Sequence, residues 1–301
     1  MKLKTLSQFV EIAKSKKTKR LVVAAAADYH VLAAVRDAKK EGIIKPILVG
    51  DKKMITKISK EISFDLKEVE IIDIANSVEA AKEAVTIIGK GDGDILMKGM
   101  VSTGPLLKAF LDKEKGLLKE KVLSHIAFFE SPYYHKIFGV TDAAMNIAPD
   151  LNEKLAIVKN AVEAFHKLGV KTPRVAVIGA VELVNPKMEA TVHAAALTQM
   201  NRREQIKNCI IDGPLALDTA ISKESAEHKG IKSYVAGECD IILVPDINSG
   251  NILYKSITFI GGGVSASVIM GAKVPFVLTS RSDSEKSKFL SIALAAAMDH
   301  N

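Results

Sequence analysis

The segment from Arg20 to Ala27, RLVVAAAA, constrains the fold of this chain more than any other feature. Every position after Arg20 is apolar, so a strand formed here is apolar on both of its faces. Strands of this kind are typical of a parallel sheet that is covered by helices on both sides. Asp28 and Gly42 then mark the expected start and end of the first helix after this strand.

The same alternation of apolar strand and helix recurs along the chain. Further strands are expected at residues 46–49, 69–74, 94–98, 125–129, 136–140, 143–147, 174–178, 208–212, 240–245 and 274–278. Helices are expected at 52–61, at 77–90 with Ser77 as the cap, from Pro105 onward, at 151–168 and at 189–203. This pattern predicts the α/β class, and a length of 301 residues favours two domains over one.

The formal net charge of +7 raises the question of nucleic-acid binding. The densest basic run, residues 14–20, contains no aromatic side chain, and the chain has no tryptophan on which a base could stack. Basic residues are also favourable at the carboxyl end of a helix. We therefore interpret the run as a solvated helix end, expect no nucleic-acid partner, and note that the positive balance suits a small polyanionic substrate.

Targeting, membrane and metal-binding signals are also missing from the sequence. The lysine-containing amino terminus does not resemble a signal peptide, and no uncharged apolar run approaches the roughly 20 residues needed to cross a bilayer. Cys209 and Cys239 lie apart and outside any Cys-x-x-Cys motif, and the histidines show no H-E-x-x-H motif. We expect a cytoplasmic protein with reduced, buried thiols, no metal and no membrane association.

Three short blocks in the last third of the chain place polar groups directly after apolar runs: residues 212–218 (DGPLALD), 245–255 (PDINSGNILYK) and 279–284 (TSRSDS). Open α/β folds place their chemistry at such strand ends. In the last block, Ser280, Arg281 and Asp283 precede a helix, whose amino terminus favours an anion. The block predicts a phosphate site, although Ser282 or Asp283 as a simple helix cap remains an alternative.

The turn from Lys98 to Thr103 is similar, because a lysine, a glycine and the hydroxyls of Ser102 and Thr103 follow a strand. It lacks the spacing of a phosphate-binding P-loop, so a phosphate or carboxylate contact and an ordinary loop both remain open. The segments 185–188 and 248–251 combine turn residues with side chains able to bind a ligand. Gly261 to Gly263 is interpreted as a hinge between domains instead of a phosphate loop.

Six blocks, taken in order, resemble the phosphate acetyl/butyryltransferase family. They are VSTGPLLKAF (101–110), TDAAMNIAPDLNEKLAIVKNAV (141–162), VELVNPKMEAT (181–191), DGPLALDTAIS (212–222), VAGECDIILVPDINSGNILYK (235–255) and LTSRSDS (278–284). The compact length and the forms of the third and last blocks are more similar to the butyryl branch, of the clostridial type, than to the acetyl branch. The resemblance covers almost the whole chain.

The resemblance implies a fold like that of isocitrate and isopropylmalate dehydrogenases. It has two α/β domains with mostly parallel central sheets and an active site in the cleft between them. One domain is discontinuous and here would join residues 1–121 to 263–301, while residues 122–262 would form the other. A homodimer or an assembly of dimers is also implied.

The implied reaction exchanges a short acyl group between coenzyme A and phosphate, reversibly, by direct attack in a ternary complex. Short-chain fatty acid metabolism, as in butyrate fermentation, would be its setting. Coenzyme A and acyl phosphate are substrates, and no cofactor is expected. By this resemblance Ser280 stabilises the oxyanion, Arg281 holds the phosphate, and Asp283 or Glu285 takes the thiol proton.

Substrate contacts are expected from Lys98, Ser102, Thr103, Asn185, Lys187, Asn251 and Lys255. One departure from the family pattern concerns residues 102–111, where the acetyl enzymes carry additional arginines and this chain has only Lys108. The hydroxyls of Ser102 and Thr103 and the nearby amides would replace them.

Two other functions remain open at this point: a metal- and NAD(P)-dependent oxidoreductase of the same fold group, and a non-catalytic sensor of acyl-CoA or acyl phosphate. The sequence shows no convincing carboxylate cluster for a divalent ion, which disfavours the oxidoreductase. It does not fix the acyl chain length, because one methylene in an apolar pocket is worth only about 1–3 kcal/mol.

Overall fold

A computed structural model describes residues 3–112, 117–280 and 282–298, and these form two compact units. Residues 3–6 and 121–265 make the central unit, and residues 7–120 and 266–298 make the discontinuous unit. The sequence analysis placed the boundaries after 121 and 262 and assigned residues 1–6 to the discontinuous domain. The structure groups residues 3–6 with the central unit instead. The expected cleft between domains stays a prediction.

The strands of the discontinuous unit are side by side in the order β3-β2-β1-β4-β11-β10. Their bounds are β1 (Lys19–Ala24), β2 (Ile44–Gly50), β3 (Glu70–Asp73), β4 (Ile95–Lys98), β10 (Val264–Met270) and β11 (Phe276–Val277). The first five strands in this order pair in parallel, and β10 is antiparallel to β11. A largely parallel sheet is what the apolar strands predicted.

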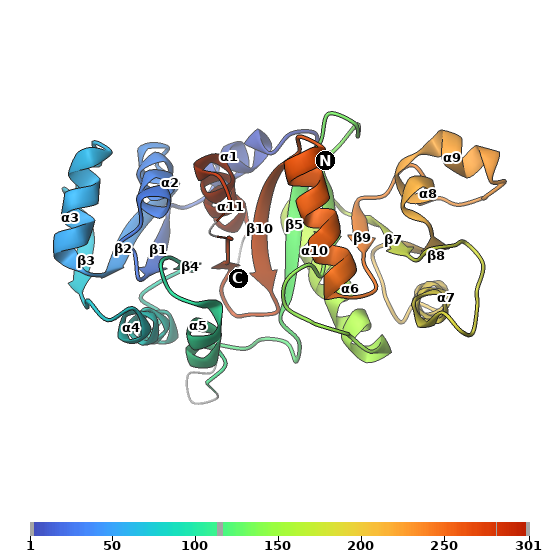
Figure 1. Cartoon of the computed structure of the whole chain (residues 1–301), viewed down its shortest axis with the longest axis horizontal. Helices are drawn as coiled ribbons and strands as arrows, with labels where there is room; N and C mark the ends of the chain where they lie inside the picture. Colours follow the sequence, from blue (N-terminus) through green and yellow to red (C-terminus); the bar gives the residue numbers. More distant parts are fainter. Residues whose placement is uncertain (1–2, 113–116, 281, 299–301) are drawn as a thin grey trace. The chain divides into compact units, whose positions relative to one another are not determined.

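Helices cover both faces of these strands (Figure 1). They are α1 (Ser7–Lys14), α2 (Tyr29–Lys40), α3 (Lys52–Glu61), α4 (Ser77–Gly89), α5 (Thr103–Phe110) and α11 (Glu285–Ala297). α11 packs against α1 and α2, and α2 packs against α3, while α4 packs against α5 on the opposite face. Leu21, Val22 and Val23 of β1 are completely buried between these layers, so β1 is central to the apolar core.

Short side chains cap the helices that follow β1, β2 and β3. Asp28 accepts a hydrogen bond from the amide of Val31, as its position before the first expected helix predicted. For α4 the expected cap, Ser77, is wrong. Asn76 is the cap, because its side chain accepts hydrogen bonds from the amides of Val78 and Glu79, and Ser77 is the first helical residue.

The central unit has strands in the order β5-β6-β9-β7-β8. Their bounds are β5 (Ser124–Glu130), β6 (Phe138–Thr141), β7 (Arg174–Ile178), β8 (Ile210–Leu215) and β9 (Ile241–Leu243). The pair β5–β6 is antiparallel, and the other pairs are parallel. The helices are α6 (Leu151–Lys167), α7 (Glu189–Arg202), α8 (Leu217–Ile221), α9 (Lys223–His228), α10 (Ile247–Lys255) and the π-helix η1 (Ser256–Ile260). Both units are therefore α/β.

Residues 143–147 do not form the strand that their apolar character predicted. The buried carboxylate of Asp142 accepts hydrogen bonds from the amides of Ala144, Met145 and Asn146 and from the Asn146 side chain, at 2.6–3.2 Å. Such local side-chain bonds compete with strand formation and turn the chain. A Cβ on Gly250 would lie 2.6 Å from the Asp142 carbonyl oxygen, so the TDAAMN and PDINSGN blocks are packed against each other.

Both cysteines are buried free thiols, and burial raises the pKa of Cys209 and of Cys239 to about 11. This agrees with the expectation of buried, reduced thiols that take no part in chemistry. In the part of the chain that the structure describes, no helix combines the length and apolar character needed to span a bilayer.

Asp142→Asn is expected to lower the free energy of unfolding by about 2–3 kcal/mol, because the new amide nitrogen would face the two Asn146 donors with no acceptor between them. Denaturant unfolding measures this. Asp92→Asn, the same change at an exposed site, serves as the control and should shift the free energy by less than about 0.5 kcal/mol. Equal stability of the two variants would contradict the structural role of Asp142.

Candidate active site

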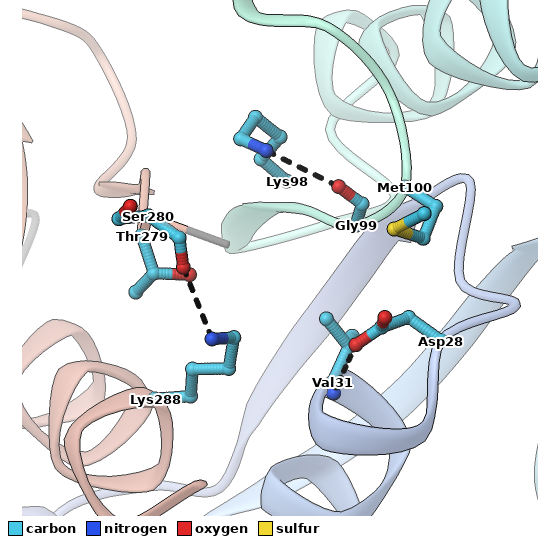
Figure 2. Close-up of a pocket in the computed structure, with 8 residues that line it drawn as sticks. All are labelled: Asp28, Val31, Lys98, Gly99, Met100, Thr279, Ser280 and Lys288. Atoms are coloured by element: carbon cyan, nitrogen blue, oxygen red, sulfur yellow. Dashed lines mark hydrogen bonds between the residues drawn. The ribbon is translucent and has the colours of Figure 1, made fainter. Parts of the chain in front are cut away.

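A pocket of about 230 Å³ lies in the discontinuous unit, beyond the carboxyl ends of β1, β4 and β11. Figure 2 shows the side chains around it. The lining residues are Asp28, Val31, Lys98, Gly99, Met100, Thr279, Ser280 and Lys288. Two blocks singled out from sequence, the turn that begins at Lys98 and the TSRSDS block, therefore meet at one pocket.

The strand order explains why the pocket forms there. From β1 the chain moves outward through β2 to β3 and then returns to the other side of β1 as β4, so the order reverses between β1 and β4. Loops that leave two parallel strands at such a point diverge to opposite faces and open a crevice. β11 is parallel to β4 on its far side and brings Thr279 and Ser280 to the same edge.

Two buried lysines reach this pocket from different elements. Lys98 is the last residue of β4 and is 6% exposed, and its Nζ donates to the carbonyl oxygens of Gly99 and Val101, each at 3.3 Å. Lys288 belongs to α11 and is 3% exposed. Burial lowers the pKa of Lys288 below the ordinary lysine value. Two lysines against the one lining carboxylate, Asp28, leave the pocket with an excess of positive charge, which favours an anionic ligand.

The loop between β11 and α11 folds on itself through its own polar groups. The Ser280 amide donates to the Asp283 carboxylate at 2.7 Å, and the hydroxyls of Ser280 and Ser282 lie 2.9 Å apart. The cap of α11 is Ser284, which accepts from the Ser287 amide at 3.1 Å. The alternative in which Ser282 or Asp283 only caps the helix is therefore wrong. Arg281 lies outside the described residues.

The two carboxylates proposed as the base have different surroundings. The Asp283 carboxylate belongs to the loop and holds the Ser280 amide. Glu285 is the first residue of α11, and its Oε1 lies 3.0 Å from Nδ1 of His30 in α2. The Asp283 carboxylate is therefore hydrogen-bonded to the pocket residue Ser280, whereas the Glu285 carboxylate contacts a side chain of α2.

The remaining expected substrate contacts are not in the lining of this pocket. Ser102 is exposed at the start of α5 without a side-chain capping bond, and Thr103 is the first residue of that helix. Four residues belong to the central unit: Asn185, Lys187, Asn251 and Lys255. Their roles stay predictions.

The structure shows the surroundings of three of these four residues. The Asn185 side chain accepts from the Lys187 amide at 3.0 Å, which is a turn contact. The Asn251 amide group reaches the Ala143 carbonyl at 3.4 Å. Lys255 is exposed at the end of α10. These contacts explain turns and packing in the blocks that contain them.

The sequence analysis missed two pocket residues, Asp28 and Lys288. Asp28 was recognised only as a helix cap, although it follows the first strand and so has the same kind of position as Lys98. Lys288 has a weaker signal: it is four residues after the capping Ser284 and three before Ser291, on the buried side of α11. A lysine on a buried helical face is uncommon and marks a position worth testing.

The pocket combines two ammonium groups, the hydroxyls of Thr279 and Ser280, and the carboxylate of Asp28, and the Asp283 carboxylate lies nearby. This set suits binding of an oxyanion together with transfer of one proton. Within the described residues, no three His, Cys, Asp or Glu side chains are gathered as a metal site requires. The expectation that no metal takes part stays a prediction.

The family model described as phosphate acetyl/butaryl transferase matches residues 4–87 and 75–296. The phosphate butyryltransferase of Clostridium acetobutylicum is 45% identical over 299 residues, which cover 99% of each chain. The phosphate acetyltransferase of Thermotoga maritima is 46% identical over 291 residues, covering 97% of this chain and 98% of the relative. The chain belongs to this family of phosphate acyltransferases, as the sequence blocks indicated.

Solved structures agree with this assignment. A branched-chain phosphotransacylase from Enterococcus faecalis V583 has a TM-score of 0.83 and 36% identity, covering 94% of this chain and 100% of that one. A protein described as a 4-hydroxythreonine-4-phosphate dehydrogenase from Salmonella typhimurium is 13% identical with a TM-score of 0.58, covering 93% and 99%. The second likeness concerns the fold alone and fits the expected dehydrogenase-like architecture. Family membership leaves the oxidoreductase alternative without support.

Gly99→Ala is expected to destabilise the protein by about 2 kcal/mol or more, because its Cβ would meet the carbonyl oxygens of Ala25 and Ala24, the latter at 2.7 Å. The backbone at the pocket would have to move. Gly104→Ala is the matched control, since a Cβ there meets nothing within 4 Å and the site is helical. It should be neutral or stabilising by up to about 1 kcal/mol. Thermal unfolding compares the two, and similar stabilities would contradict this packing.

Proposed function

We propose that the protein exchanges a short acyl group, preferably butyryl, between coenzyme A and inorganic phosphate. The observation that carries the proposal is the pocket where Lys98, Ser280 and Lys288 meet, in a chain that belongs to a phosphate acyltransferase family. Its charge suits the phosphate, and its hydroxyl and the adjacent Asp283 suit the groups that change charge during transfer.

In the direction that forms the thioester, the thiol gives its proton to a carboxylate and the thiolate attacks the acyl carbon. The carbonyl oxygen becomes an oxyanion, to which the Ser280 hydroxyl donates a hydrogen bond. The carbon–sulfur bond forms, the carbon–oxygen bond to phosphate breaks, and phosphate leaves into the positive field of Lys98 and Lys288. Arg281 would add a second donor to the phosphate, as the family resemblance implies.

Asp283 is our preferred base, because its carboxylate is fixed to the amide of Ser280, whose hydroxyl donates to the oxyanion that forms when the thiolate attacks. Glu285 is the alternative, with its carboxylate held by His30. Direct transfer in a ternary complex needs no further cofactor, and none is proposed. A homodimer or assembly of dimers, a cytoplasmic location and small-molecule partners alone complete the proposal.

The preference for butyryl is supported by the forms of the VELVNPKMEAT and TSRSDS blocks. Overall similarity does not select it, because the butyryl and acetyl relatives are 45% and 46% identical to this chain. Ser102, Thr103, Asn185, Lys187, Asn251 and Lys255 are proposed as contacts to phosphate, coenzyme A or the acyl chain. Since each methylene contributes about 1–3 kcal/mol, the preference should be graded over chain length.

Phosphate-dependent release of thiol from acetyl-, propionyl-, butyryl- and valeryl-CoA tests the function. We expect release from all four, with the highest kcat/KM for butyryl-CoA, because the apolar part of the site gains contacts up to that length. A maximum at acetyl-CoA would reject the butyryl preference alone. Tight binding of butyryl-CoA without turnover of any donor would reject transfer and favour the sensor.

Ser280→Ala is expected to lower kcat about 100-fold or more, because it removes a donor to the oxyanion. Asp283→Asn should cause a loss of the same order if Asp283 is the base, and Glu285→Gln should then remain within about tenfold of the wild type. Lys286→Ala, at an exposed position of α11, is the control. The opposite ranking of the two carboxylate variants would assign the base to Glu285.

A further inference from the structure

The proposed function uses only the charge of Lys288, and the hydrogen bonds of this almost completely buried pocket residue have no role in it. Its Nζ donates to the carbonyl oxygens of Ser280 at 3.0 Å and Asp283 at 2.5 Å. We propose that Lys288 is a positioning residue for acyl transfer, whose ammonium holds Ser280 and Asp283 by these two carbonyls. This inference rests on the proposed function.

The two carbonyls belong to the residues that carry the proposed chemistry. Two further bonds join the same pair of residues: the Ser280 amide donates to the Asp283 carboxylate, and the Asp283 amide donates to the Ser280 carbonyl at 3.2 Å. Lys288, on α11, holds the carbonyls of both residues, so the backbones that carry the Ser280 hydroxyl and the Asp283 carboxylate cannot separate without breaking its bonds. Figure 2 shows the lysine reaching from α11 toward Ser280 beside the pocket.

Packing alone does not require a lysine at this position. Neighbouring residues of the helix, Leu290 and Ile292, are buried and apolar, and a methionine would occupy a similar volume without loss of hydration. Burying an ammonium is costly, and among the described residues two carbonyls and the negative charges of Asp28, Asp283 and Glu285 offset this cost. Retaining a charge under these conditions indicates that the charge is used.

The charge also acts on the pocket itself. An ammonium has three donors, and the two loop carbonyls occupy two of them. The positive charge therefore remains beside a cavity in which an anionic phosphate would sit, on a different element from Lys98. The Lys288 ammonium thus both holds Ser280 and Asp283 in place and attracts the anionic phosphate.

The test compares Lys288→Met, Lys288→Arg and Lys286→Met, the last being the same change at an exposed position on the same helix. We expect Lys288→Met to lower kcat about 30- to 100-fold, because the reacting groups are no longer held in register. KM for butyryl-CoA should change less than about threefold, because in this proposal the lysine acts on the loop and not on the acyl-CoA. Lys288→Arg keeps the positive charge and the hydrogen-bond donors, so its kcat should be at least about tenfold higher than that of Lys288→Met.

Thermal unfolding separates positioning from a structural role. Lys288→Met removes a buried charge but leaves two loop carbonyls without this donor, so the melting temperature should fall by no more than about 4 °C. Loss of kcat together with a larger fall in melting temperature would overturn the proposal, as would a kcat within about threefold of Lys286→Met. If Lys288→Met does not fold, Lys288→Gln, which keeps one donor, takes its place under the same criteria.

The pH profile supplies an independent measure. Burial lowers the pKa of Lys288, against the opposing effect of Asp28, Asp283 and Glu285, and Lys98 lies in the same pocket. The clamp is intact below the pKa of Lys288 and is lost as the pH rises through it. Wild-type kcat should therefore fall on the alkaline side below the usual lysine range, and in Lys288→Arg this limb should move to higher pH. An identical limb in both enzymes would overturn the proposal.

Wild-type activity distinguishes the two levels of inference. If the wild-type protein releases no thiol from any acyl-CoA, the proposed function fails and the role of Lys288 fails with it. If the wild-type protein turns over and Lys288→Met retains its kcat, only the role of Lys288 is rejected.

Discussion

The parallel pairing of β4 with β1 on one side and with β11 on the other is the constraint on which the candidate site depends. Parallel strands bring their carboxyl ends to one edge, so residues that follow three separate strands meet there. The close approach of Gly99 to the carbonyl oxygens of β1's final residue and Ala25 fixes how the turn after β4 begins. Without this approach, Lys98 would not share a pocket with residues from the end of the chain.

Two buried lysines determine the electrostatic preference of the pocket for an anion. Lys98 and Lys288 are both withdrawn from water, and both are held by backbone carbonyls of the loops that form the pocket wall. Positive charge in a partly desolvated pocket acts on an anion more strongly than the same charge on an exposed surface. The formal charge of +7 suggested a polyanionic substrate without indicating where it binds. Lys98 and Lys288 place positive charge at one pocket.

Much of the fold followed from local sequence, because the continuous apolar pattern of β1 and the cap at Asp28 can both be recognised from neighbouring residues. The failures have local causes too: Asn76 caps instead of Ser77, and the Asp142 carboxylate turns an apolar segment that would otherwise extend. The TSRSDS block was located because it follows a strand. The position of Lys288 could not be found in this way, since its contacts depend on how α11 is placed against the preceding loop.

The pairing order has a consequence for synthesis of the chain. β4 ends at Lys98, but its partner β11 starts at Phe276, so 178 residues must be made after Lys98 before the pairing can begin. At about 5–20 residues per second, this takes roughly 10–35 s on the ribosome. During that interval one edge of β4 lacks its final partner and is open to pairing with other chains. The amino-terminal segment of the growing chain therefore carries an exposed strand edge until β11 has been made.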